Sequence, residues 1–179
     1  MIRIALDLDD VLFGFTQEYE RRFNKQKNYL TNKAITRNVQ KLRKDKHFWE
    51  NLPKLRDLKG FTPELYCTKR TSSKTYAKNA LEKNGFPKRP IYRVLTQTAN
   101  KADYIKGRAD VLIDDSFFNI RQALTVDFPA ILLTTPENKN MDCKYRIEDL
   151  SIDEITTMYH IVVNDIKNNK IPKNVRIRN

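Results

Sequence analysis

Two groups of acidic residues stand out as candidates for chemistry. Asp7, Asp9 and Asp10 follow one apolar stretch of the chain, and Asp114 and Asp115 follow another. A carboxylate beside a buried strand is costly to remove from water unless a cation compensates its charge. The spacing of these acids therefore indicates a site for a divalent metal ion with oxygen ligands.

The first acidic group has a structural interpretation as well. Asp7, Asp9 and Asp10 can form a solvated turn that caps a helix, and taken alone that segment slightly favours this interpretation. The second group favours the metal site over the solvated turn, because ligands of an open parallel sheet bind at the carboxyl ends of its strands. Two strands that each end in acids can bring those acids to one point.

The elements that must position these acids alternate between strand and helix patterns. We expect strands at residues 2–6, 65–67, 91–95, 110–113 and 129–134, and helices ending near Asn84 and covering 98–106, 117–125 and 152–166. Residues 136–149 are polar and are expected to form a loop. This alternation predicts the α/β class with a doubly wound parallel sheet, in which right-handed crossovers bring the strand ends to one edge.

Four motifs in this order resemble those of the haloacid dehalogenase (HAD) superfamily of phosphatases. They are Asp7-Leu8-Asp9-Asp10-Val11-Leu12, Thr68 after its strand, Lys101, and Ile113-Asp114-Asp115-Ser116. One departure is Asp10, which stands where many members have Gly. The Thr-Lys-Arg turn, the Val-Leu-Ile-Asp-Asp-Ser segment and a short helical insertion look most like the deoxyribonucleotidase-type members.

The resemblance implies roles for the first motif and for the phosphate-binding residues. Asp7 would attack phosphorus to form an aspartyl-phosphate, and Asp9 would protonate the leaving oxygen and then activate water. Thr68 and Lys101 would hold phosphate oxygens. Lys69 and Arg70 can add positive charge at the same turn, or both can equally point to solvent. Lys106 is a rival to Lys101, which we prefer because its spacing before Asp114 suits a helix followed by a strand.

The resemblance also implies Mg²⁺ as the cofactor. Its ligands would be the Asp7 side chain, the backbone carbonyl of Asp9 and an acid of the fourth motif. We expect Asp115 to bind the ion directly. Asp114 would act through a water molecule or by contacting a residue that binds the ion.

The implied organisation is a HAD-like Rossmannoid core of residues 1–13 and 61–166 with a small helical cap, residues 14–60, inserted after the first strand. The cap segment has 13 Lys or Arg against 5 Asp or Glu, which is +8 of the net charge of +12. Residues 167–179 form a basic C-terminal tail, which is more often a solubilising tail than a binding element. The charge indicates an anionic partner, and most of these basic residues are expected to solvate outer helix faces.

These features predict a Mg²⁺-dependent phosphomonoesterase that acts on a phosphorylated small molecule. The preferred substrate is a nucleoside monophosphate, which would make the enzyme similar to a 5′-nucleotidase. Two alternatives stay open: a phosphatase acting on nucleic-acid ends, and a non-catalytic HAD-like protein that binds nucleic acid or has a structural role. The chain has no apolar run of the length that a membrane span needs, and its start does not resemble a signal peptide. Its two cysteines lack the close spacing of zinc or redox sites, so we expect a cytoplasmic protein.

Overall fold

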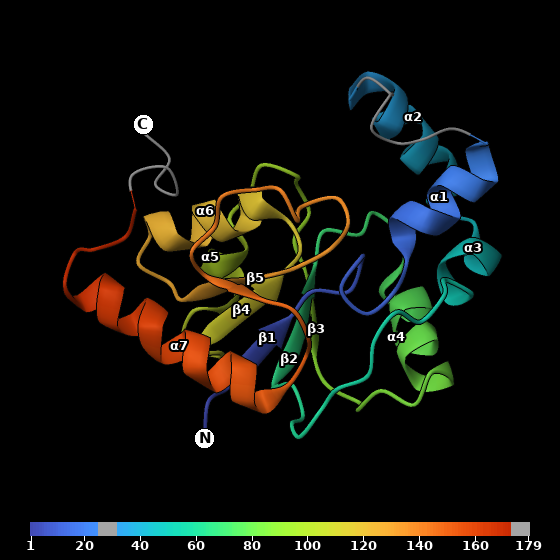
Figure 1. The fold of residues 1–179 in the computed structure, drawn as a ribbon. Helices are drawn as coiled ribbons and strands as arrows, with labels where there is room; N and C mark the ends of the chain where they lie inside the picture. The colour runs from blue at the N-terminus through green and yellow to red at the C-terminus, as the bar shows by residue number, and fades with distance from the viewer. Residues whose placement is uncertain (25–31, 173–179) are drawn as a thin grey trace.

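The computed structural model describes residues 1–24 and 32–172, and a six-stranded sheet lies at its centre (Figure 1). The strands are β1 (Ile4–Leu6), β2 (Leu65–Thr68), β3 (Ile91–Arg93), β4 (Val111–Asp114), β5 (Ala130–Leu133) and β6 (Arg146–Ile147). Their order is β3-β2-β1-β4-β5-β6, and every pairing is parallel. The predicted α/β class with a doubly wound parallel sheet is confirmed.

The described residues also form helices. They are α1 (Phe15–Phe23), α2 (Asn32–Leu42), α3 (Lys46–Glu50), α4 (Lys74–Lys83), α5 (Lys101–Ile105), α6 (Phe117–Thr125) and α7 (Ile152–Lys167). Helices α1 to α6 lie between strands in the chain, and α7 follows the last strand. Figure 1 shows the strands lying between α7 and the pair α5 and α6. No helix among the described residues has both the length and the apolar character that a membrane crossing requires.

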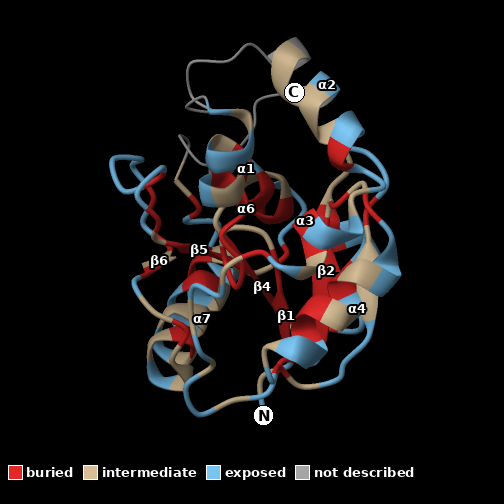
Figure 2. Cartoon of the chain, turned by 90° about the vertical axis from the view of Figure 1, so that its right-hand side faces the viewer, coloured by how far each residue is buried: buried red, intermediate tan, exposed pale blue. Residues whose placement is uncertain are grey.

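The central position of β1 explains its composition. It pairs with β2 on one side and β4 on the other, and all of its residues are buried (Figure 2). A parallel strand covered on both faces needs a continuous apolar run rather than an alternating pattern. Polar residues are therefore absent from the strand itself, and the first polar residue after it is Asp7, at its carboxyl end.

Two expectations from the sequence need correction. The segment 136–149, expected to be a loop, contains β6, which pairs with β5 through the registers Leu132↔Arg146 and Leu133↔Ile147. The helix expected over residues 98–106 is shorter, because the Asn100 side chain accepts a hydrogen bond from the Ala102 backbone and starts α5 at Lys101. The other expected elements are present, with boundaries that differ by one to three residues at some ends.

Helices α1, α2 and α3 come between β1 and β2 in the chain, and Figure 1 shows α1 and α2 beyond the carboxyl end of β1. They occupy the segment expected to form a cap, although the division into core 1–13 and 61–166 and cap 14–60 stays a prediction. Helix α7 ends at Lys167, where the basic tail was expected to begin. Most of that tail, residues 173–179, lies outside the described residues.

Candidate active site

Three carboxylates from two neighbouring strands meet at the carboxyl edge of the sheet. Asp7 follows β1 directly, and its backbone N–H donates to the carbonyl of Ile113 at 3.0 Å, which continues the pairing of β1 with β4. This register places Asp7 beside Asp114, the last residue of β4, and Asp115. One carboxylate oxygen from each of Asp7, Asp114 and Asp115 lies within 4.8 Å of the others.

Lys101 supplies positive charge to this cluster of three aspartates. Its side chain is fully buried, and Nζ lies 2.7 Å from Asp7 Oδ1 and 2.7 Å from Asp114 Oδ2. Burial lowers the pKa of Lys101, but the two carboxylates outweigh this effect and raise it overall, so the amine stays charged. The rival residue Lys106 is exposed, and the structure places only Lys101 between the two strand ends.

Asp114 and Asp115 have different surroundings. Asp114 is fully buried, and besides Lys101 it accepts hydrogen bonds from the Ser116 backbone at 2.9 Å and from Asn119 Nδ2 at 3.0 and 3.1 Å. Asp115 is half-buried and faces the cavity beside the cluster. Asp114 therefore has little capacity left for a ligand, which agrees with the expected preference for Asp115.

The loop after Asp7 is a tight turn. The Leu8 carbonyl accepts from the backbones of both Leu12 and Phe13, at 2.9 and 3.0 Å, and Asp10 adopts a positive φ of 60°. The Asp10 side chain accepts hydrogen bonds from the Thr16 backbone at 2.8 Å and the Thr16 hydroxyl at 2.6 Å. Asp10 thus caps the first turn of α1, a role that the sequence left open.

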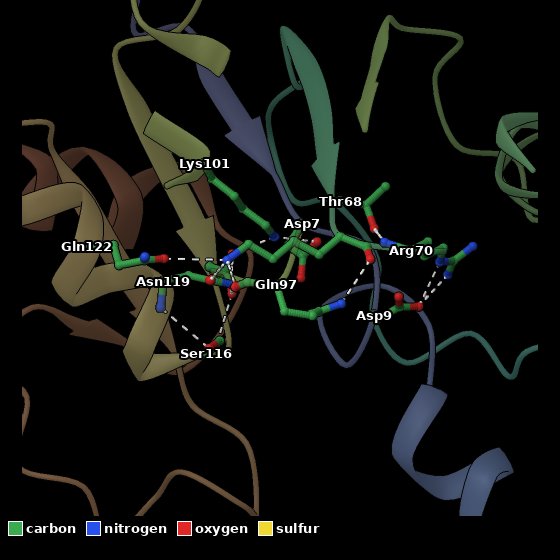
Figure 3. A network of polar contacts seen from close by, with 11 residues as sticks. Asp7, Asp9, Thr68, Arg70, Gln97, Lys101, Ser116, Asn119 and Gln122 are labelled. Carbon is green, nitrogen blue, oxygen red and sulfur yellow. Dashed lines mark hydrogen bonds and ion pairs between the residues drawn. The ribbon is translucent and has the colours of Figure 1, made fainter. Parts of the chain in front are cut away.

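The Asp9 side chain points toward Arg70, as Figure 3 shows. Arg70 Nε donates to Asp9 Oδ1 at 2.7 Å, and the arginine side chain is 1% exposed. From the sequence, Arg70 was expected only to add charge at this turn, with a solvent-facing side chain as the equal alternative. Only its position two residues after Thr68 pointed to it, and no local pattern distinguishes a buried arginine from a solvated one.

The predicted phosphate-binding residues of the turn after β2 lie at different depths. Thr68 is 2% exposed, its hydroxyl accepts from the Arg70 backbone at 3.1 Å, and it is not among the described residues that line the cavity. Lys69 does line the cavity, and its Nζ donates to the Gln97 carbonyl and to Asn119 Oδ1, each at 2.8 Å. Burial and the nearby Lys101 lower the pKa of Lys69.

Burial, together with the nearby carboxylates, raises the pKa values of Asp7 and Asp115. Burial, with the charges of Asp114 and Asp9, raises the pKa of Asp7 from 3.8 to about 7, even though Lys101 opposes this shift. Burial and the charges of Asp114 and Asp7 also raise the pKa of Asp115 well above its ordinary value. Asp7 Oδ1 is buried and accepts no hydrogen bond from any described residue, although it pairs with the Lys101 charge. An additional hard cation would relieve these costs, so the donor set fits Mg²⁺.

This electrostatic arrangement predicts a pH dependence of stability. Because the pKa of Asp7 is about 7 in the folded state and 3.8 ordinarily, the folded state holds more protons than the unfolded state between about pH 4 and 7. We expect the free energy of unfolding of the metal-free protein to fall as the pH rises across this range. Mg²⁺ binds the ionised form, so it should raise the melting temperature more at pH 8 than at pH 6.

Thermal melts in MgCl₂ and in EDTA at both pH values measure this effect. Asp7→Asn serves as the control, because it removes the titrating carboxyl and should remove most of the difference between the two pH values. A larger increase with Mg²⁺ at pH 6 than at pH 8 would contradict the prediction.

A cavity of about 670 Å³ opens beside the cluster of three aspartates. Its polar lining residues include Asp7, Asp9, Lys69, Lys101 and Asp115. Its apolar lining residues, here called the apolar wall, are Phe15, Ile35, Val39, Trp49, Leu95 and Phe118. The lining therefore offers both charged and apolar contacts, and it suits a ligand that has groups of both kinds.

Comparisons with known proteins address the fold. No protein-family model and no curated protein matches the chain. Among solved structures, it is similar to the HAD-hydrolase YfnB from Bacillus subtilis, crystallised with magnesium, with a TM-score of 0.52 at 16% identity over 91% of this chain and 99% of that one. It is also similar to a dehalogenase, with a TM-score of 0.51 at 7% identity over 88% of this chain and 96% of that one. These similarities, together with the parallel sheet, show that the chain has the α/β fold of the HAD hydrolases.

Proposed function

We propose that this protein is a Mg²⁺-dependent phosphomonoesterase that acts through an aspartyl-phosphate on Asp7. The observation that carries the proposal is the meeting of Asp7, Asp114 and Asp115 within 4.8 Å at one sheet edge, with the buried Lys101 between Asp7 and Asp114. The fold that the chain shares with the two solved structures supports the hydrolase class. The YfnB structure is bound to magnesium, and this supports the proposed choice of metal.

The residues divide the reaction into two steps. In the first, an Asp7 oxygen bonds to phosphorus while the ester oxygen leaves with its electron pair and takes a proton from Asp9. In the second, Asp9 takes a proton from water, whose oxygen bonds to phosphorus and releases phosphate and free Asp7. Lys101 holds the Asp7 carboxylate in place and balances phosphoryl charge. Mg²⁺, held by Asp7, Asp115 and the Asp9 carbonyl, would supply further positive charge to the phosphoryl oxygens.

A phosphoryl substrate suits the site better than the carbon–halogen bond implied by the name of the second similar structure. Displacing a halide from carbon brings one carboxylate to a neutral centre and needs no divalent cation. Here three carboxylates lie close to one lysine, and the raised pKa values of Asp7 and Asp115 indicate that this lysine does not fully compensate their negative charge. A cation site next to the nucleophile is useful when the substrate is itself an anion.

A nucleoside monophosphate is the substrate we propose within this class. The apolar wall, which includes Val39 and Phe118, can contact a planar base while the phosphate lies at Asp7. A nucleic-acid end is the second candidate, because Leu95 and Phe118 on this wall are 71% and 49% exposed and leave room for a strand to continue outward.

The experiment is phosphate release from a panel of substrates, with MgCl₂ or with EDTA. The panel holds nucleoside monophosphates, p-nitrophenyl phosphate, oligonucleotides with 5′- or 3′-phosphate ends, and chloroacetate assayed for chloride release. Mg²⁺-dependent phosphate release supports the proposed function, and the ratio of mononucleotide to oligonucleotide turnover ranks the two substrate candidates.

Chloride release without phosphate release would replace the phosphatase by a dehalogenase. Absence of turnover on the whole panel, together with salt-sensitive oligonucleotide binding that survives Asp7→Asn, would favour the non-catalytic nucleic-acid-binding alternative.

A further inference from the structure

An arginine is buried in the turn after β2 with a single anionic partner among the described residues. Both Nε and Nη2 of Arg70 lie 2.7 Å from Asp9 Oδ1, and the side chain is 1% exposed. Nη1 and Nη2 are buried and donate no hydrogen bond to any described residue. A buried guanidinium is costly without an oxygen partner, so this environment favours keeping the Asp9 carboxyl group at Arg70 through Oδ1.

Aromatic rings hold Arg70 from two directions. The guanidinium carbon lies 5.3 Å from the ring centroid of Phe13 and 5.3 Å from that of Trp49. The Trp49 ring is held in turn, because its Nε1 donates to the Leu42 carbonyl at 2.8 Å and its face stacks on Phe15 at 5.6 Å with an interplanar angle of 10°. Cation–π contact with two rings leaves the guanidinium little freedom to turn.

The Asp9 carboxylate has few other constraints. It lies in the turn that follows β1, its side chain is 22% exposed, and it lines the cavity. In the part of the chain that the structure describes, Arg70 is the one side chain that bonds to it. Without Arg70, rotation about the bonds of Asp9 would let the carboxyl group leave its place at the cavity.

We infer that Arg70 is a positioning residue for Asp9: it holds the proton-transferring carboxyl group at the cavity and ties its placement to Trp49 of α3. This inference rests on the proposed function, because it assigns a purpose to the Asp9–Arg70 pair within that reaction. Arg70 touches neither Asp7 nor Lys101 in any described contact, so it acts through Asp9. A displaced acid group lowers the rate without removing the nucleophile.

The leaving group provides a readout specific to this role. A nucleoside monophosphate releases a strongly basic alkoxide oxygen, which needs a proton as it leaves. p-Nitrophenyl phosphate releases a weakly basic phenolate, which leaves readily without one. Loss of acid positioning should therefore affect the first substrate much more than the second, whereas general damage to the fold should affect both alike.

The experiment measures kcat and KM for both substrates in Arg70→Gln, Arg70→Lys and Asp9→Asn. Arg70→Gln should lower kcat on the nucleoside monophosphate about 10²-fold and on p-nitrophenyl phosphate less than about 5-fold, with Asp9→Asn showing the same selectivity. Arg70→Lys keeps the charge but loses the forked geometry, so its losses should be intermediate. Arg70→Gln in the Asp9→Asn background should lower kcat little further, because both changes remove the same contribution of Asp9 to proton transfer.

Arg108→Gln is the matched control. Arg108 is exposed, lies before the amino end of β4 and contacts the Tyr92 ring at 5.4 Å, so its loss should leave both rates unchanged. Circular dichroism and a thermal melt show whether Arg70→Gln folds. If it does not, Arg70→Lys tests the inference through the ratio of its kcat loss on the nucleoside monophosphate to its kcat loss on p-nitrophenyl phosphate.

Equal losses on the two substrates, or fully additive effects of Arg70→Gln and Asp9→Asn, would overturn the inference while the proposed function stands. A wild-type protein that turns over neither ester would overturn the proposed function, and the inference with it.

Discussion

Asp7→Asn is expected to lower phosphate release by at least about 10³-fold, because an amide cannot act as the attacking oxygen. The side chain keeps its size, and its amide oxygen can still lie against the Lys101 amine. Loss of one of the crowded carboxylates also removes a charge whose ionisation burial opposes. The metal-free variant should therefore melt at or above the temperature of the wild type at pH 8, and Mg²⁺ should stabilise it less.

The measurements are steady-state kinetics on the best substrate of the panel and thermal melts with and without MgCl₂. Asp110→Asn is the matched control, since Asp110 pairs with Arg3 at 2.7 Å before the amino end of β4. That variant should retain activity, because it changes an exposed ion pair away from the cavity. Wild-type rates in Asp7→Asn would exclude Asp7 as the nucleophile.

Lys101→Met should produce the largest loss of stability of any change at this site. Lys101 is fully buried and offsets the charges of Asp7 and Asp114, each 2.7 Å from its Nζ. Its removal leaves two buried carboxylates without a cation, and breaking such a pair costs about 3–5 kcal/mol of unfolding free energy. We expect that loss in urea denaturation of the metal-free variant at pH 8.

Three further measurements separate charge from packing. Lys101→Met combined with Asp114→Asn removes one of the two uncompensated charges and should recover part of the lost stability, whereas Lys106→Met, at an exposed position, should change little. MgCl₂ should also stabilise Lys101→Met, because the cation replaces part of the missing positive charge. A loss below about 1 kcal/mol in Lys101→Met would show that the buried charges are compensated in another way.

The sequence was sufficient to predict the sheet and the meeting of its acids, and the reason is physical. Strands buried on both faces must be continuously apolar, so the first acid after each run marks where the strand ends. Parallel strands then align these ends, which brings Asp7 next to Asp114 although 106 residues separate them. Asn100 and Ser116 carry a local signal that the sequence analysis did not use, since each caps a helix with its side chain.

Other features depend on contacts that no local pattern records. Strand β6 has only two residues, Arg146–Ile147, and exists through its pairing with β5. The role of Arg70 depends on Phe13 and Trp49, which come from two segments distant from it in the sequence. Asn119 reaches Asp114 only because α6 begins at Phe117 and turns the amide back toward the strand.

The register of β1 with β4 has a consequence for how the protein is made. Ile4 pairs with Val111, and Leu6 pairs with Ile113, so β1 is synthesised 107 positions before this partner strand begins to exist. Until then its apolar side chains lack one of their two neighbouring strands, and contacts of such long sequence separation form slowly. A truncated nascent chain ending before residue 111 would hold Asp7 but none of its acidic partners from β4. The proposed catalytic centre can therefore form only after β4 has been made, although its proposed nucleophile is synthesised more than 100 residues earlier.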